Sequence, residues 1–314
     1  MLLLGDSFTV GVNVEQSDTY ASVLETLLNN NHPIPIQVVN TGVGGWEPFE
    51  YAQYYEHYGQ KFSPDLILIG FFVGNDTYNQ TANVNQTRTA VLGRRISRKV
   101  ALEPFIEFKV FLYNNFNIAR FILYKGPIKA DITRKNCTDF SEQYLKIQHN
   151  RLNNHLKLTK QREKRAENAL YQIRRIKALA KKDSVPLVIA LIPDENQINA
   201  ELQRVLLGEI KPSRYDFHMP QSMLIESFNK DAIPVIDLLP FFLKDSRCLY
   251  MNDTHWTAEG HALAAEVIYN DITNRKIIPD LSFKSSRSQK PLLSRMTDVT
   301  EYFTTCLEEK QHAK

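Results

Sequence analysis

The chain has 314 residues, which is enough for one large α/β domain or two small ones. Its composition, 43% hydrophobic and 23% charged, is ordinary for a globular protein, and a net charge of +3 is too small to imply a nucleic acid or another polyanion as partner. Because the three cysteines (Cys137, Cys248 and Cys306) are far apart and odd in number, without a CxxC pair, we expect neither a disulfide framework nor a zinc or redox site.

Five segments are predicted to be strands of a parallel sheet. Each is a short and nearly continuous apolar run, as expected of strands that are buried on both faces. In chain order they are residues 1–4, 34–39, 65–73, 185–192 and 233–239.

Helices with amphipathic spacing alternate with these strands. They are residues 20–28 (N-cap Asp18 or Thr19), 49–58, 165–182 and 257–272 (N-cap Thr257). The alternation predicts a three-layer α/β/α sandwich with right-handed crossovers.

Residues 78–160 are far more than one crossover helix needs, so we expect a helical insertion after the third strand. Within it, residues 88–135 carry eleven Lys/Arg against three Asp/Glu, interleaved with seven aromatic side chains. Either these aromatics form a small satellite core, or the segment is a lid or a patch that contacts an anionic membrane surface or polymer. The expected domain spans residues 1–274, and residues 275–314 are predicted to form a polar tail.

The first apolar run is too short for a signal peptide or a membrane span. Because the chain opens inside a predicted core strand, we expect further residues upstream in the natural gene product. The compartment is therefore cytoplasmic by the chain as given, or extracytoplasmic or membrane-associated if an upstream segment directs it there.

Groups suited to nucleophilic catalysis follow the first three predicted strands. Ser7, in Gly5-Asp6-Ser7, is a candidate nucleophile, although a serine here could simply cap a helix. The glycines of Gly42-Val43-Gly44-Gly45 would let backbone N–H groups approach a ligand, or they form a loose turn. Asn75, in Gly74-Asn75-Asp76, could donate an amide hydrogen bond to an oxyanion, or this too is a turn.

The segment Asp253-Thr254-His255 precedes the last helix. His255 is a candidate general base with Asp253 as its orienting carboxylate, although Asp-x-His alone is often a turn. His261, inside the helix, is more simply an interior or rim histidine. The histidines show no metal-ligand spacing, and no dinucleotide or phosphate loop is present, so we expect neither a metal nor a cofactor. All these groups lie at the carboxyl edge of the sheet, where open α/β folds bind ligands.

Gly5-Asp6-Ser7, Gly45, Asn75 and His255 resemble the four signature blocks of the SGNH hydrolase superfamily, the GDSL esterases and lipases. The resemblance covers roughly residues 1–77 and 165–272. It implies a flavodoxin-like sheet and metal-free hydrolysis or transfer of acyl esters. Ser7 would be the nucleophile and His255 the general base. The oxyanion hole would comprise the N–H groups of Ser7 and Gly45 and the amide of Asn75, with Gly44 as the alternative to Gly45.

The last block departs from the common Asp-x-x-His form, which would place the acid at Asn252. Asp253 instead gives Asp-x-His followed by Trp256, which resembles the SGNH-like enzymes of bacterial exopolysaccharide O-acetylation. We therefore expect a serine ester hydrolase that acts by an acyl-enzyme on a small-molecule or carbohydrate O-acyl ester. A polysaccharide O-acyltransferase and a non-catalytic SGNH-fold binding module are the alternatives, and the oligomeric state stays open.

Overall fold

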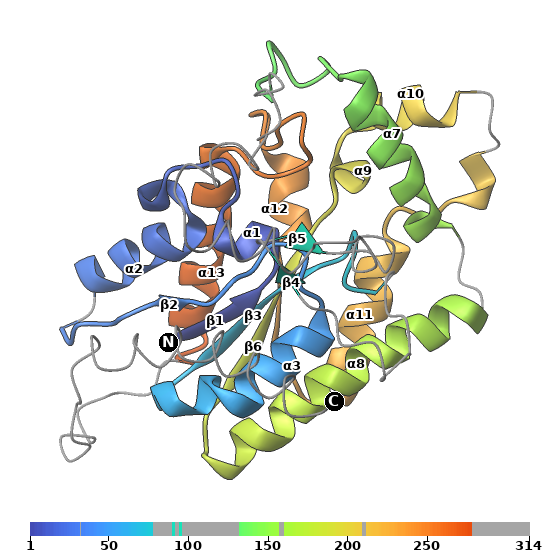
Figure 1. The fold of residues 1–314 in the computed structure, drawn as a ribbon. Helices are drawn as coiled ribbons and strands as arrows, with labels where there is room; N and C mark the ends of the chain where they lie inside the picture. Colours follow the sequence, from blue (N-terminus) through green and yellow to red (C-terminus); the bar gives the residue numbers. More distant parts are fainter. Residues whose placement is uncertain are drawn as a thin grey trace, which may run out of the picture.

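The computed structural model describes residues 1–31, 33–77, 132–156, 160–208 and 212–277, with a short antiparallel pair, β4 (Ala90–Val91) and β5 (Arg94–Arg95). Five parallel strands form the central sheet in the order β2-β1-β3-β6-β7 (Figure 1). Their bounds are β1 (Leu2–Gly5), β2 (Val39–Asn40), β3 (Ile67–Phe72), β6 (Leu187–Ile192) and β7 (Val235–Asp237). Counted along the chain, the order is that of a flavodoxin-like sheet, so the predicted fold class is confirmed.

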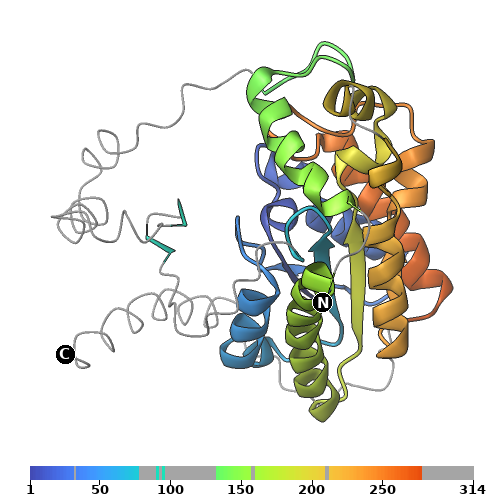
Figure 2. The same ribbon diagram turned by 90° about the vertical axis from the view of Figure 1, so that its right-hand side faces the viewer.

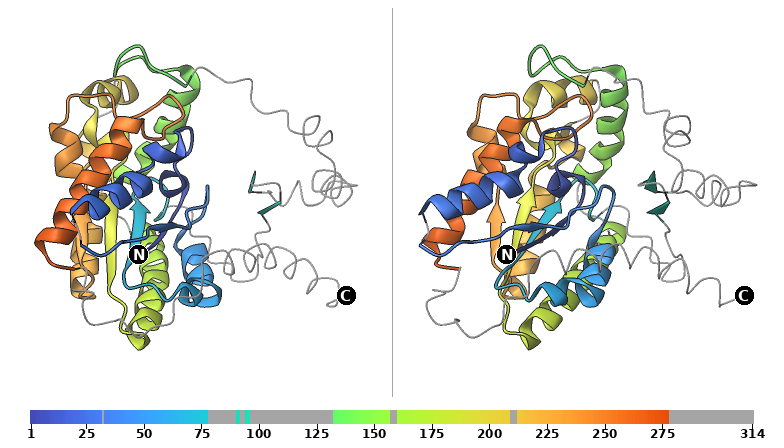
Figure 3. Two further views of the ribbon diagram at one scale, coloured as in Figure 1. Left: turned by 90° about the vertical axis from the view of Figure 1, so that its left-hand side faces the viewer. Right: turned by 60° about the vertical axis from the view of Figure 1, so that its left-hand side comes forward.

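Helices cover both faces of the sheet and complete a three-layer α/β/α sandwich (Figure 1). One face packs against α2 (Tyr20–Asn31), α12 (Leu239–Lys244) and α13 (Ala258–Asn274), and Figure 3 shows α2 and α13 side by side. The other face packs against α3 (Pro48–His57), α8 (Lys160–Lys182) and α11 (Met219–Lys230), with α8 and α11 adjacent in Figure 2. Thr19 and Thr257 cap α2 and α13, since their hydroxyls accept from Ser22 N–H and Gly260 N–H, each at 3.3 Å.

The central strands are apolar on both sides because each side meets a helix layer. In β3, Leu68 and Phe72 join the core beneath α2 and α13, while Ile67, Ile69 and Phe71 join the core beneath α3 and α8. Side chains alternate across a strand, so two buried faces require a continuous apolar run.

The second strand is much shorter than predicted. Only Val39–Asn40 pairs with β1, whereas residues 34–39 were expected to form a strand. In residues 34–38, backbone N–H groups bond to side chains of α2 instead of to β1. Ile36 N–H donates to Asn29 Oδ1 at 2.7 Å, and Val38 N–H donates to Glu25 Oε2 at 2.6 Å. Pro35 has no N–H to give to a ladder. The segment is therefore fastened to a helix rather than to the sheet.

Several short helices gather beyond the carboxyl ends of the strands (Figure 1). They are α1 (Ser7–Val10), α7 (Glu142–Arg151), the 3-10 turn η3 (Leu152–His155), α9 (Glu195–Ile198) and α10 (Ala200–Leu207). Of the predicted insertion, residues 132–156 are described; they are partly helical and reach this edge, since Asn154 Nδ2 donates to the carbonyl of Gly74 at 2.7 Å. Apart from β4, β5 and residues 132–135, the segment predicted as a lid, residues 88–135, lies outside the described residues.

The cysteine count led us to expect no disulfide framework, but the structure contains one disulfide. Cys137 and Cys248, 111 residues apart, form a disulfide with a Cα–Cα distance of 5.0 Å. An odd count of distant cysteines gives no pairing signal, so the pair could not be predicted from sequence. The fold brings the segment around Cys137 beside the loop that precedes α13. Within the described ranges, no helix is both long and apolar enough to cross a membrane.

Protonation of His261 is expected to destabilise the fold between pH 6.5 and about 4. The ring is buried and its Nδ1 accepts from Tyr20 N–H at 3.2 Å, which requires the neutral form. Burial, and then the charge of His255, lowers the pKa of His261 to about 4. Because this pKa is lower in the folded than in the unfolded chain, the stability is fully present above pH 6.5 and is lost as pH falls through 4. The fully developed loss is about 3 kcal/mol.

Chemical denaturation at several pH values measures this loss. In His261→Asn, whose amide oxygen can still accept a hydrogen bond, the free energy of unfolding should fall less between pH 6.5 and 4 than in the parent. His57→Gln, at an exposed histidine of α3, is the matched control and should follow the parent. Equal pH dependence in the parent and in His261→Asn would refute the assignment.

Candidate active site

Ser7 is the first residue of α1 and follows β1 directly. Asp6 fixes this junction: its fully buried carboxylate accepts from Phe8 N–H at 2.9 Å and caps the helix. Burial raises the pKa of Asp6, against hydrogen bonds from Phe8 and Asn75 and the charges of His255 and Arg151. Ser7 is thus held at the carboxyl edge of the sheet, and its side chain stays partly exposed.

The glycine-rich loop after β2 runs beside Ser7. Val43 N–H donates to the carbonyl of Gly5 at 3.1 Å, which extends the contact with β1 beyond the strand. A Cβ on Gly42 would lie 2.4 Å from Val10 N, so no larger residue fits there, and Gly45 has a φ of +79°, which favours glycine. A Cβ on Gly44 would lie 3.9 Å from that of Ser7, which places this glycine next to the serine.

Asn75 lies in the turn that ends β3 and points its amide toward the Ser7 junction. Its Nδ2 donates to Asp6 Oδ2 at 3.2 Å, while its buried Oδ1 has no hydrogen-bond partner among the residues that the structure describes. Asp76 holds the turn, because its buried carboxylate accepts from Phe72 N–H at 2.9 Å and from the Tyr51 hydroxyl at 3.2 Å. Burial, and next the charge of Asp6, raises the pKa of Asp76. The amide of Asn75 keeps a second N–H beyond the one given to Asp6.

Asp253 and His255 form a close pair before α13. Asp253 Oδ2 is 2.9 Å from His255 Nδ1, and Oδ1 accepts from His255 N–H at 3.1 Å. Asn13, from the loop after α1, donates its amide to Asp253 Oδ2 as well. Burial alone would raise the pKa of Asp253, but the hydrogen bonds and the charge of His255 outweigh it and lower the pKa. The carboxylate is therefore ionised and oriented toward the imidazole.

Asn252, at the position of the acid in the common Asp-x-x-His block, faces away from His255. Its Oδ1 accepts from Ser141 N–H at 3.2 Å and from Arg134 Nε at 3.3 Å. Its backbone N–H donates to the carbonyl of Ile132 at 2.8 Å. Of the two residues, only Asp253 is hydrogen-bonded to the imidazole.

The structure brings the two halves of the candidate site to one sheet edge. The imidazole of His255 packs against Phe8, the residue after Ser7, with ring centroids 5.4 Å apart. No hydrogen bond joins the Ser7 hydroxyl to His255 among the described contacts, as is common before substrate binds. Two residues were not predicted from sequence. Asn13 binds Asp253, and its only signal was its place shortly after Gly11, the glycine that ends α1. Asn252 joins the loop to Ser141 and Arg134.

Among the described residues, no group of three or more His, Cys, Asp or Glu side chains is arranged to hold a metal ion. The ionisable groups at the edge pair with one another instead. Asp194, after β6, lies 3.8 Å from Arg151 Nη1, and Glu195 binds Arg134 Nη1 at 2.6 Å.

The flavodoxin-like sandwich with a serine at the first strand end defines the class as SGNH-type. A sequence profile of the family "SGNH hydrolase-like domain, acetyltransferase AlgX" matches residues 152–312, and the chain belongs to this family. Its fold and family mark it as a protein that acts on acyl esters, by hydrolysis or by acetyl transfer. A comparison with curated protein sequences gives no match.

Solved structures with a similar fold have low sequence identity to this chain. One is a lipolytic protein of the G-D-S-L family from Desulfitobacterium hafniense DCB-2, with 13% identity, 86% of this chain and 97% of that chain covered, and a TM-score of 0.42. A variant of Axe2, an acetyl-xylooligosaccharide esterase from Geobacillus Stearmophilus, has 13% identity, coverages of 92% and 96%, and a TM-score of 0.45. TesA has 9% identity, coverages of 87% and 97%, and a TM-score of 0.46. At these values no functional residue is inferred from them.

Proposed function

We propose that the protein is a serine ester hydrolase that forms an acyl-enzyme on Ser7 with a short O-acyl ester, from a small molecule or a carbohydrate. The observation that carries the proposal is the Asp253–His255 pair, with 2.9 Å between Oδ2 and Nδ1, set against the helix that begins at Ser7. A carboxylate on Nδ1 keeps the proton there and leaves Nε2 free to act as a base.

The reaction would proceed by double displacement. His255 Nε2 takes the hydroxyl proton while Ser7 Oγ attacks the ester carbonyl, and the new oxyanion accepts hydrogen bonds from the N–H groups of Ser7 and Gly45 and the amide of Asn75. His255 then gives the proton to the leaving alcohol. Water attacks the acyl-serine in the second half, with His255 again as base, and frees the acid.

Acetyl transfer to a polysaccharide is the second candidate, and the family match favours it. The same residues would perform it, because a sugar hydroxyl that replaces water in the second half accepts the acyl group from Ser7. Incubation with an activated acetyl ester and an oligosaccharide distinguishes the two. A gain of one acetyl group on the oligosaccharide, dependent on Ser7, supports transfer, and release of acetate alone supports hydrolysis.

An activated serine should react with a fluorophosphonate probe. We expect a single adduct on Ser7 by peptide mass spectrometry, and none in His255→Ala. Ser17, in the 3-10 turn η1 (Gln16–Asp18), is a partly hydrogen-bonded surface serine in the same chain and serves as the internal control. A parent protein without an adduct, or with equal labelling of Ser17, would contradict the proposal and favour a non-catalytic binding module.

Loss of the Asn75 amide should slow turnover without unfolding the protein. Asn75→Ala removes one oxyanion donor, and the expected fall in kcat is about 10²–10³-fold with KM little changed. Hydrolysis of a p-nitrophenyl ester and thermal unfolding measure the two effects. An unchanged kcat in a folded Asn75→Ala variant would exclude the donor role.

A further inference from the structure

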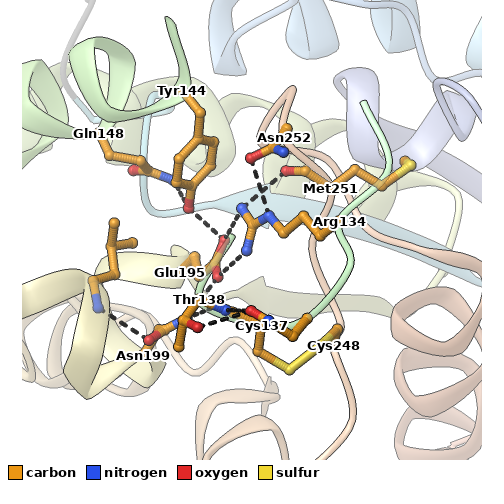
Figure 4. Close-up of polar contacts among 12 residues, drawn as sticks. Arg134, Cys137, Thr138, Tyr144, Gln148, Glu195, Asn199, Cys248, Met251 and Asn252 are labelled. Carbon is orange, nitrogen blue, oxygen red and sulfur yellow. Dashed lines mark hydrogen bonds and ion pairs between the residues drawn. A yellow bond between two sulfur atoms is a disulfide. The ribbon is translucent and has the colours of Figure 1, made fainter. Parts of the chain in front are cut away.

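We propose that Arg134, acting with the Cys137–Cys248 disulfide, is a positioning residue for the Asp253–His255 pair. The inference rests on the proposed function, since it assigns what holds the general base in place. Figure 4 shows the contacts of Arg134 with Glu195, Met251 and Asn252, and the disulfide beside them. Residues 132–141, here called the strap, run beside the loop 248–256 that carries both catalytic side chains.

The strap and the loop are joined at both ends of the contact. Asn252 N–H donates to the carbonyl of Ile132 at 2.8 Å, and Ser141 N–H donates to Asn252 Oδ1 at 3.2 Å. The disulfide adds a covalent link before the loop turns toward Asp253. The side chain of Asn252, the residue before Asp253, is thus hydrogen-bonded to the strap.

Arg134 is the centre of this contact and is almost fully buried, with 3% of its side chain exposed. Its guanidinium binds both carboxylate oxygens of Glu195, at 2.6 and 2.9 Å, and lies 4.4 Å above the ring of Tyr144. Two further hydrogen bonds go to the catalytic loop: Nε donates to Asn252 Oδ1 at 3.3 Å, and Nη2 donates to the carbonyl of Met251 at 3.1 Å. A planar fork of donors suits such simultaneous contacts, and lysine has no equivalent.

Glu195 is a fixed anchor for this bridge. It begins α9, three residues after β6 ends, and only 4% of its side chain is exposed. The Tyr144 hydroxyl donates to its Oε2, and Asn199 Nδ2 donates to its Oε1 at 2.9 Å. The bridge therefore runs from the sheet through Glu195 and Arg134 to the loop.

The loop needs such support because its turn is strained. Thr254, between the two catalytic residues, has a φ of +79°, a left-handed conformation that is costly for a β-branched residue. Strained backbone persists only where its surroundings over-determine it. The carbonyl of Met251 accepts both Thr254 N–H at 3.0 Å, which closes the turn, and Arg134 Nη2. Arg134 thus holds the carbonyl on which the turn closes.

The test removes the bridge without leaving a buried charge. Arg134→Met alone would strand Glu195, so the variant is Arg134→Met/Glu195→Leu, which replaces the pair with apolar side chains. We expect kcat for a p-nitrophenyl ester to fall roughly 10–100-fold, as for a catalytic group displaced by about 1 Å, with KM little changed. The matched control is Arg204→Met/Glu201→Leu, at an exposed Arg–Glu pair of α10, which should leave both constants unchanged.

A spectroscopic readout separates positioning from general destabilisation. The Nδ1 proton of His255, shared with Asp253, should give a low-field ¹H NMR signal in protein with ¹⁵N-histidine. We expect the signal to broaden or vanish in the bridge variant at temperatures where circular dichroism reports a folded chain. A sharp, unshifted signal with unchanged kcat in a folded variant would overturn the proposal.

Two milder variants keep the test decisive if the bridge variant does not fold. Asn252→Ala removes the acceptor of Arg134 Nε but leaves the ion pair, and it should lower kcat in the same direction. Cys137→Ser/Cys248→Ser removes the disulfide between the strap and the loop, a bond that forms only where thiols are oxidised. This variant should also lower kcat. Cys306→Ser is its control. If both variants match the parent in kcat and in the NMR signal, the strap does not position the pair.

Failure of the proposed function is distinguishable from failure of this inference. A parent protein that neither hydrolyses esters nor binds the probe at Ser7 refutes the function. The Nδ1 signal does not depend on turnover, so its response to the bridge variant still tests whether Arg134 holds the pair.

Discussion

Ser7→Ala is expected to abolish ester hydrolysis, with kcat reduced by roughly 10⁵–10⁶-fold. The hydroxyl oxygen forms the bond to the acyl group, so its removal leaves only the oxyanion donors and substrate binding. The variant should fold like the parent, because Asp6 caps α1 through its own carboxylate and the side chain of Ser7 lies at a partly exposed edge. Initial rates with a p-nitrophenyl ester measure the effect.

The control for this variant is Ser17→Ala, which removes a hydroxyl from η1 and should leave the rate unchanged. Ser7→Cys offers a second comparison, since a thiol keeps a nucleophile at the same place and should form a measurable thioester. Loss of a single oxyanion donor already lowers kcat by about 100-fold, and loss of the nucleophile must lower it further. Hydrolysis in Ser7→Ala at more than about a hundredth of the parental rate would therefore rule out Ser7 as the nucleophile.

The sheet could be predicted because its signal is local. Continuous apolar runs such as residues 67–72 identify strands buried on both faces, and alternation with amphipathic helices fixes a parallel sheet with its strand ends at one edge. Ser7, Asn75 and Asp253 each follow a strand or precede a helix, so sequence places them at that edge.

What sequence could not supply was set by contacts between distant segments. The strand at residues 34–39 shrinks because Asn29 and Glu25 compete for its donors, which no property of the strand itself reveals. The Cys137–Cys248 bond depends on how the insertion returns to the sheet edge. The contact of Asn252 with Arg134, 118 residues away in the chain, is likewise invisible until the fold is known.

Asp253→Asn is expected to lower kcat by about 10⁴-fold while the protein stays folded. An asparagine amide would donate to His255 Nδ1, which moves the imidazole proton to Nε2 and removes the base that faces the serine. The amide oxygen, in the place of Oδ1, can still accept from His255 N–H, so the loop keeps that contact. Asn13 loses its acceptor, because it donates to the same Oδ2 that faces the imidazole. Asp245→Asn, which weakens an ion pair with Arg247 in the same connection before α13, is the matched control and should retain the parental rate.

The double variant Asn252→Asp/Asp253→Asn decides between the two possible positions of the acid. If the common Asp-x-x-His arrangement could operate here, a carboxylate at residue 252 would restore the rate. We expect no recovery, because Oδ1 of residue 252 accepts from Ser141 N–H and Arg134 Nε, and a carboxylate would pair with that buried guanidinium instead of His255. Steady-state rates of the parent, both single variants and the double variant complete the cycle. A tenfold or greater gain of the double variant over Asp253→Asn would mean that the loop can turn residue 252 toward the imidazole, and Asp253 would then not be the required acid.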